Sequence, residues 1–393
     1  MSICYKILIK NLYINTMNKF LKLVALLLLV VTVANSQETG YLFTMKKELA
    51  CTPVKNQNAT STCWCFSGIS MLESELLRAG KKSYDLSEMF IVRHTYEKKA
   101  QMYARMHGSS EFAGGGEYGD LLIGCREVGL MPDIAYPGLN YGDVKHNHNE
   151  MDAALKGFMD AVIKSPRLST AWFAGLNGIL DAYLGKIPDN FSYEGKTYTP
   201  VSFMKELGIN PDDYVLLTSF SHHPYYKQFV LEVPDNWAGG SWYNLPLDEL
   251  IQVIDNSVTT GYTVAWASDM SDKGFSMKQG VAIIPEKNWN EMTEEEASKV
   301  FNGPHAEKVI TQEMRQKEFD NYTTTDDHGM HIIGLATDQS GNTFYKVKNS
   351  WGVMGKYDGF IFVSRPFVML RTTNIMVNKN AIPQAIAKKL GII

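Results

Sequence analysis

Apolar side chains recur at helical spacing after residue 62, at Trp64, Phe66, Ile69, Leu72, Leu76 and Leu77. This pattern predicts an amphipathic helix that ends at Gly80. Ser61 and Thr62 stand just ahead of it and are good N-cap residues. Cys63 is therefore expected in the first turn, where free backbone N–H groups and the helix dipole favour the thiolate form of cysteine.

Helices continue through the first half of the chain. Ser87 is a good N-cap for a second helix, and a third helical run ends at Gly129. Residues 145–210 are expected to form an irregular helical region whose polar connectors are surface loops. His146 and His148 lie in one of these connectors, so we expect them to be exposed to solvent rather than bound to a metal.

The pattern changes to β-strands from about residue 213. Short runs rich in β-branched and aromatic residues predict strands at 215–220, 228–233 and 262–267. Strong alternation over 328–338, a turn, and a second alternating run from residue 343 predict a β-hairpin within an antiparallel sheet.

The N-terminus has the pattern of a secretory signal peptide. Met17, Asn18 and Lys19 precede a dozen apolar residues at 23–34, and a cleavage point is expected near Ser36. This apolar run is shorter than the roughly 20 residues of a membrane span. We therefore predict that residues 1–36, including an upstream extension, are removed, and that the protein is exported to the periplasm or secreted without a membrane span.

The composition is that of a globular protein with a sizeable core. The 393 residues are 45% hydrophobic and 20% charged, with a net charge of −4. Because there is no basic bias, nothing indicates a nucleic-acid partner. Four cysteines follow the signal segment, at positions 51, 63, 65 and 125, which allows at most one disulfide if Cys63 stays free. Cys63 and Cys65 are a weak metal signal on their own, and we predict no metal and no cofactor.

Three residues that are scattered along the sequence would complete a site around Cys63. His328 is a candidate base, and Asn349, 21 residues later, would hold its imidazole ring in place. Gln57 would place an amide N–H beside the backbone N–H of Cys63, which gives two donors for an oxyanion. A nucleophile, a base, an orienting group and an oxyanion hole are what acyl transfer requires.

Other interpretations stay open at this point. A lone cysteine on an apolar helix is more often a small buried residue than a nucleophile. A metal hydrolase would use His328 and His331, but His331 lies three residues along a strand, points to the opposite face and is expected to be structural. A non-catalytic protein could bind peptides in the same cleft, although it would not need Gln57, Cys63, His328 and Asn349 together.

The motifs around these residues resemble those of papain-like cysteine peptidases. The matching segments are Q-x5-C-W-x-F-S from Gln57, the glycines and glutamate at 115–117, H-x5-G from His328, and N-S-W-G from Asn349, in the order found in that family. His328 follows Cys63 by 265 positions, compared with roughly 130 to 150 in papain itself. This long separation is similar to that of the branch formed by bleomycin hydrolase and aminopeptidase C.

The resemblance implies a papain-like two-lobed α+β fold for a single domain at 37–393. A helical lobe would span about 55–210 and carry a large helical insertion. A lobe of antiparallel strands, similar to a β-barrel, would span about 211–380. The cleft between the two lobes would hold the site.

The same resemblance assigns roles and an activity. It makes Cys63 the nucleophile, His328 the general base and then acid, Asn349 the orienting residue and Gln57 the oxyanion donor. Trp351 would shield the hydrogen bond between the imidazole and the amide, and the backbone of the glycine pair Gly115 and Gly116 would run antiparallel to a bound peptide. It implies hydrolysis of peptides through a thioester acyl-enzyme, and a homo-oligomer.

Aminopeptidase specificity is the first expectation from the resemblance, with endopeptidase or dipeptidyl peptidase action as the alternative. Members of this branch end in a tail that enters the cleft and leaves room only for a free N-terminus. The present chain stops at AIPQAIAKKLGII, apparently short of that tail.

Overall fold

The computed structural model describes residues 13, 16–17, 19 and 40–392, and Leu42–Ile393 forms one compact unit. The apolar core of the predicted signal peptide and its cleavage point near Ser36 lie outside the described residues. Among the described residues, no helix is both long enough and apolar enough to cross a membrane.

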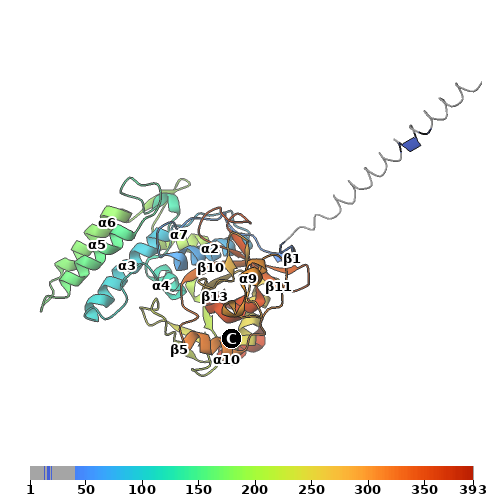
Figure 1. The fold of residues 1–393 in the computed structure, drawn as a ribbon. Helices are drawn as coiled ribbons and strands as arrows, with labels where there is room; N and C mark the ends of the chain where they lie inside the picture. Colours follow the sequence, from blue (N-terminus) through green and yellow to red (C-terminus); the bar gives the residue numbers. More distant parts are fainter. Residues whose placement is uncertain (1–12, 14–15, 18, 20–39, 393) are drawn as a thin grey trace, which may run out of the picture. The chain divides into compact units, whose positions relative to one another are not determined.

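Within residues 40–392, six α-helices precede β4, and the first of these six is the predicted cysteine helix (Figure 1). They are α2 (Cys63–Arg78), α3 (Glu88–Arg105), α4 (Tyr118–Val128), α5 (Asn149–Val162), α6 (Ala171–Leu184) and α7 (Pro200–Leu207). Ser87 caps α3 as predicted, because its Oγ accepts a hydrogen bond from the N–H of Phe90 at 3.0 Å. Helices α3, α5 and α6 pack side by side, away from the sheet (Figure 1).

Eleven strands form one sheet in the described part of the chain. They are β1 (Phe43–Glu48), β4 (Tyr214–Thr218), β5 (Gln228–Val230), β6 (Ser241–Asn244), β7 (Val264–Ser268), β8 (Phe275–Ser276), β9 (Val281–Ala282), β10 (His328–Asp338), β11 (Thr343–Lys348), β12 (Phe360–Ser364) and β13 (Thr372–Asn378). Their order is β5-β6-β4-β13-β7-β10-β11-β12-β9-β8, and β1 pairs with β10.

The sheet differs from the predicted barrel-like lobe because its strands form an open path rather than a closed barrel. All pairings are antiparallel except β4 with β6 and β9 with β12. The remaining helices of the second half are α8 (Leu247–Thr260), α9 (Glu294–Lys299), α10 (Gln312–Asp320), α11 (Arg365–Arg371) and α12 (Gln384–Leu390).

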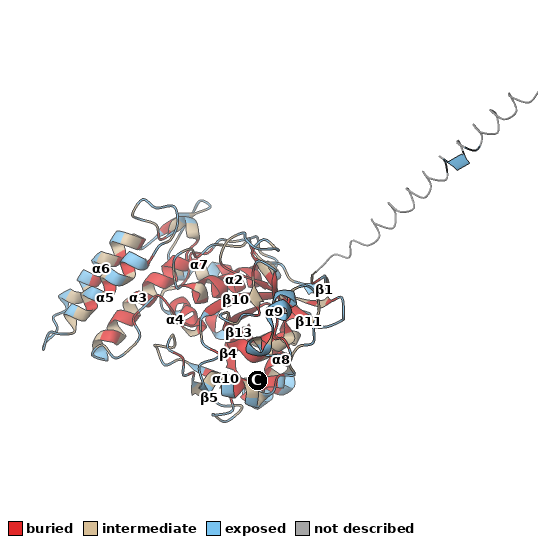
Figure 2. Ribbon diagram, viewed as in Figure 1, coloured by how far each residue is buried: buried red, intermediate tan, exposed pale blue. Residues whose placement is uncertain are grey.

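Two large hydrophobic clusters make up most of the core. One joins the first six helices, and the other packs α8, α11 and α12 against the sheet. Figure 2 shows that burial is greatest around α2, β10 and β13, whereas α5 and α6 present broad exposed faces. The elements that carry the predicted site residues are therefore the most deeply buried ones.

The connector before α5 is largely exposed, as its polar sequence predicted, but His148 within it is buried. His148 is only 1% exposed, and its N–H donates to the carbonyl of Ala59 at 3.0 Å. Burial lowers the pKa of His148 to about 3. His148 is buried because the connector lies against the loop that precedes α2, a long-range contact that a local pattern does not reveal. A second departure is a small hairpin of β2 (Phe191–Tyr193) and β3 (Lys196–Tyr198), where a loop was expected.

Candidate active site

Cys63 is the first residue of α2, as the hydrophobic pattern predicted. Thr62 is the N-cap residue, and its carbonyl accepts from the backbone N–H groups of Cys65 and Phe66. Its side chain does not cap the helix, because its Oγ1 is 2.6 Å from the Oγ1 of Thr60. The side chain of Thr62 therefore leaves the N–H groups of Cys63 and Trp64 uncapped, and that of Trp64 acts on the thiol of Cys63.

Strand β10 packs directly against the first turns of α2. A Cβ atom added at Gly329 would lie 2.7 Å from the Oγ of Ser67 and 3.2 Å from the carbonyl oxygen of Cys63. Only glycine permits this approach without displacing α2. The preceding residue, His328, is thereby brought beside Cys63, and both line one cleft with a volume of about 540 Å³.

The imidazole of His328 is held in one orientation by Asn349. Its Nε2 lies 2.7 Å from the Oδ1 of Asn349, and that oxygen also accepts from the N–H of Ser350 at 2.7 Å. Because Oδ1 is an acceptor in both contacts, Nε2 must carry the proton of the neutral ring, which leaves Nδ1 free to accept one. The ring of Trp351 covers this pair, with its centroid 4.9 Å from that of the imidazole.

Gln57 faces the same cleft and is fixed by its own amide group. Its Oε1 accepts from the Oγ of Ser350 at 2.7 Å, and its Nε2 donates to the carbonyl of Thr60 at 2.8 Å. This assigns the two ends of the amide, and the second hydrogen on Nε2 remains available. Gln57 is thus placed to donate to an oxygen that forms next to Cys63.

The remaining predicted residues occupy different layers of the site. Gly115 and Trp351 line the cleft, whereas Gly116 lines a small recess that opens beside Cys63. Asn349 is 2% exposed and lies behind His328 rather than on the cleft surface. The structure therefore brings together all seven residues that the sequence singled out.

The protonation state of Cys63 differs from the thiolate form that its position at a helix N-terminus predicted. Burial raises the pKa of Cys63 to about 12, and the nearby carboxylates of Asp326 and Asp235 add to this rise, whereas the N–H of Gly329 opposes it. Burial also lowers the pKa of His328 to about 4, against the opposing effect of Asn349. The resting pair is therefore a neutral thiol beside a neutral imidazole.

Several charged residues of the site were not found from the sequence. Asp235 and Asp327 line the cleft. Lys99 is buried, and its Nζ donates to the carbonyls of Ala113, at 2.7 Å, and Gly115. The position of Asp327 directly before His328 could have drawn attention to it. No local sequence pattern marks Asp235 or Lys99 as a site residue, because only the folding of the chain brings them to the glycine segment.

The other cysteines and His331 lie outside the cleft. Within residues 40–392 all four cysteines are free, so the structure contains no disulfide among Cys51, Cys65 and Cys125. The Nδ1 of His331 lies 2.9 Å from the Oγ of Ser70, in a buried polar cluster with Lys348. The metal-hydrolase interpretation required His331 to act with His328, and this position does not favour it.

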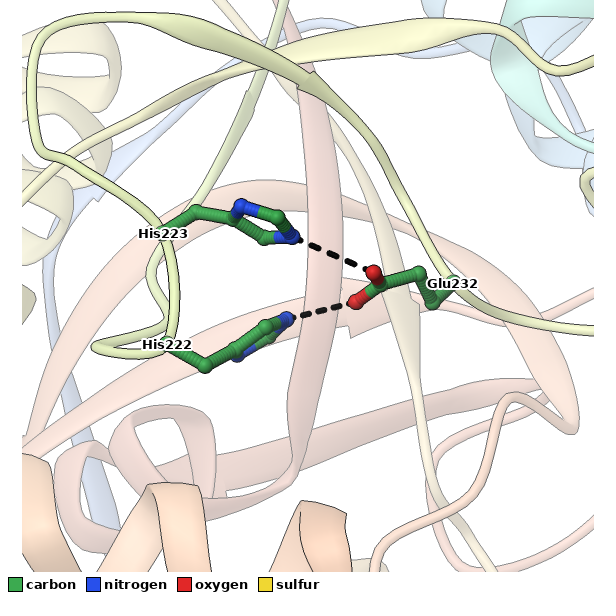
Figure 3. A group of neighbouring side chains, drawn as sticks. All are labelled: His222, His223 and Glu232. Atoms are coloured by element: carbon green, nitrogen blue, oxygen red, sulfur yellow. Dashed lines mark hydrogen bonds and ion pairs between the residues drawn. The ribbon is translucent and has the colours of Figure 1, made fainter.

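Among the described residues, only one set of three or more side chains could hold a metal ion, and it does not include His328 or His331. His222, His223 and Glu232 face one another, with Glu232 accepting from Nε2 of both imidazoles (Figure 3). The Nδ1 of His222 accepts from the Nε2 of Gln316 at 2.9 Å, while the N–H of Ser221 fixes the Oε1 of Gln316 at 2.6 Å. His222 must then carry its proton on Nε2, so the three groups form a hydrogen-bonded cluster rather than a set of free metal ligands.

Two protein-family models and several known proteins match this chain. The family model for the Peptidase C1-like family matches residues 186–391, more than half of the chain, and that for papain family cysteine proteases matches 42–106. Aminopeptidase C of Lactobacillus delbrueckii subsp. lactis is 23% identical, with 88% of this chain and 83% of the relative covered. The mitochondrial cysteine proteinase 1 of Saccharomyces cerevisiae is 21% identical, with 86% and 77% covered.

A solved structure shares the fold. The crystal structure of PepW from Lactobacillus rhamnosis HN001 matches with a TM-score of 0.70 at 18% identity, covering 89% of this chain and 85% of that one. Together with the family matches, this confirms the papain-like α+β fold and the resemblance to the aminopeptidase C branch. The chain belongs to the Peptidase C1-like family and is a cysteine-type peptidase.

Proposed function

We propose that this protein is a cysteine aminopeptidase that uses Cys63 as its nucleophile. The observation that carries the proposal is the unprotonated Nδ1 of His328, in an imidazole that Asn349 orients and that lies in one cleft with Cys63. A neutral thiol needs a base to attack a carbonyl at neutral pH, and this imidazole can accept its proton as the attack proceeds.

The remaining groups of the site support the next steps. The carbonyl oxygen of the scissile bond becomes an oxyanion, which the N–H of Cys63 and the amide of Gln57 can stabilise. The protonated His328 then gives its proton to the leaving amine, which leaves a thioester on Cys63. Water, activated by the same imidazole, hydrolyses the thioester and frees the thiol.

Aminopeptidase action is preferred to endopeptidase or dipeptidyl peptidase action because of the relatives. Two of them, both from Lactobacillus delbrueckii subsp. lactis, are named aminopeptidase C and aminopeptidase G, and each aligns over more than four-fifths of this chain. Peptides with a free N-terminus are thus the proposed substrates. Export after cleavage near Ser36 and assembly into a homo-oligomer remain predictions.

A comparison of blocked and free peptides tests the specificity. We expect a peptide with a free N-terminus to be cleaved with a kcat/KM at least about 100-fold above that of the same peptide after acetylation, because acetylation removes a charge that binding requires. Both rates are measured by release of the C-terminal fragment. Equal rates would replace the aminopeptidase proposal with endopeptidase action.

The pKa of His328 predicts the acid limb of the reactivity of Cys63. The imidazole must be neutral to accept the thiol proton, and its pKa of about 4 lies below the ordinary value. We therefore expect the rate of epoxide alkylation at Cys63, which needs the base but not the binding of a substrate amine, to stay constant from pH 7 to about 5 and to fall by half near pH 4. Burial raises the pKa of Asp327 to about 7, so the profile is repeated with Asp327→Asn. Half-loss near pH 6.5 in both proteins would contradict a buried neutral base.

A further inference from the structure

A small recess opens from the cleft beside the nucleophile. Cys63, Asp235, Asp327 and His328 line both the cleft and the recess, so the two spaces adjoin each other. The recess has a volume of about 10 Å³, which is room for roughly one water molecule. An ammonium group is of similar size, whereas a bulky side chain would not fit.

The wall of the recess contains two carboxyl groups that lie against each other. Glu117 is 3% exposed, and its Oε2 accepts from the Nδ2 of Asn374 at 2.9 Å. Its Oε1 is buried and meets no hydrogen-bond donor among the described residues. The carboxyl group of Asp326 lies beside it, and burial raises the pKa of Asp326 to about 6 and that of Glu117 as well. Such a pair must share a proton unless a cation approaches it.

A third carboxyl group, from Asp235, stands where the recess meets the cleft. A Cβ atom added at Gly115 would collide with both carboxylate oxygens of Asp235, so this side chain lies directly over the glycine backbone. Burial raises the pKa of Asp235, whereas Lys99 and the N–H of Gly116 favour its charged form. Asp235 thus covers backbone that an extended peptide would otherwise pair with, and it closes this end of the cleft to a longer chain.

The loop that carries Asp235 is anchored on both sides. Asn236 donates to the carbonyls of Leu231 and Gly240 at 2.7 and 2.9 Å, which closes the loop on itself. The Nε1 of Trp237 donates to the Oδ2 of Asp120 in α4 at 3.0 Å. The carboxylate of Asp235 is therefore held in place before a ligand arrives, which lowers the entropic cost of binding.

The carboxyl groups of the recess are not paired with a cation in a salt bridge within the described part of the chain. Glu117, Asp235 and Asp326 form no salt bridge with any residue that the structure describes. Lys99 is the cation that acts on Asp235, but its Nζ already donates to the carbonyls of the glycine segment. A bound cation would relieve the repulsion between these carboxylates.

We propose that this recess, with Asp235 at its rim, binds the N-terminal ammonium group of the peptide substrate. The inference rests on the proposed function and deepens it. The ammonium nitrogen of an N-terminal residue is two bonds from the scissile carbonyl carbon, so its counter-charge must lie beside the nucleophile. Asp235 would then serve two purposes, because it blocks longer chains and pairs with the free amine.

The test uses a substrate pair that differs in charge but not in size. Leucyl anilide is compared with the anilide of the corresponding 2-hydroxy acid, in which a hydroxyl group replaces the amine. We expect the full-length wild-type protein to prefer the amine by about 10- to 100-fold in kcat/KM, the range of a hydrogen bond to a charged group. Asp235→Asn should bring the two substrates within about threefold, and Asp235→Glu should restore most of the preference.

A matched control distinguishes the effect of the recess on substrate preference from the effect of the overall charge of the loop. Glu232→Gln removes a carboxylate three residues away, whose oxygens face His222 and His223 rather than the cleft (Figure 3). This variant should keep the wild-type preference for the amine. Equal cleavage of the amine and the hydroxy analogue by the wild-type protein would overturn the inference, and so would an undiminished preference in Asp235→Asn.

The ammonium group could also come from a lysine side chain, and a third substrate distinguishes this source. Acetyl-lysyl-leucyl anilide has no free N-terminus but carries a lysine as the second residue before the scissile bond. It should be cleaved far more slowly than leucyl anilide, and a faster rate that Asp235→Asn abolishes would assign the recess to the side chain instead. Other results would contradict the proposed function, namely cleavage that does not depend on the thiol or equal rates on free and acetylated peptides.

Discussion

Cys63→Ala is expected to abolish peptide hydrolysis, with a loss in kcat/KM of at least about 10⁴-fold. The reason is that the thioester cannot form without the sulfur atom, whereas Gln57, His328 and the cleft all remain in place. The measurement is release of aniline from leucyl anilide by purified protein. Because Cys63 is partly accessible at the start of α2 and alanine is a good helix former, the thermal unfolding midpoint should change little.

Cys51 provides the matched control for this experiment. It is a free, partly accessible thiol whose pKa burial also raises, but it does not line the cleft. Cys51→Ala should retain activity, and an epoxide that alkylates active-site thiols should modify wild-type protein and Cys51→Ala at residue 63. Turnover above about 1% of wild type in Cys63→Ala would mean that another residue is the nucleophile.

His328→Gln is expected to lower kcat/KM by about 10³-fold or more. With the thiol pKa raised to about 12, almost no thiolate exists at pH 7, so attack depends on a base that removes the proton. A glutamine amide can still contact Asn349 but cannot accept a proton at this pH. The rate of epoxide alkylation at Cys63 should fall together with the peptidase rate.

The control for this variant is His223→Gln, on an imidazole that faces Glu232 rather than the cleft. This variant should leave both the peptidase rate and the rate of epoxide alkylation at Cys63 unchanged. If His328→Gln kept rapid alkylation of Cys63, the thiol would ionise without this base. The neutral resting pair inferred from burial would then be wrong.

The parts of the site that the sequence predicted are those with a strong local pattern. The apolar spacing after Cys63 placed this residue at a helix start, and the alternation around His328 and Asn349 placed them on one hairpin. In each case short-range periodicity and the buried face agree.

The parts that the sequence did not predict depend on distant contacts. Strand β13 lies in the middle of the sheet, yet it follows α11 without a glycine or proline to mark its start. The pKa of Cys63 follows from burial and from Asp235 and Asp326, which outweigh the helix terminus. His148 was expected in solvent because its neighbours are polar, but its burial arises from a contact with Ala59.

The position of β13 also determines when the sheet can be completed during synthesis of the chain. This strand joins β4 to β7, and β7 in turn holds the start of β10 through the pairing of Ser268 with His328. When the ribosome has reached residue 327, the nascent chain contains the thiol of Cys63 but not yet the imidazole of His328. Even after residue 349 has emerged, the sheet stays in two pieces until residues 372–378 insert. We therefore expect the complete sheet to form only after nearly all of the domain has been translated.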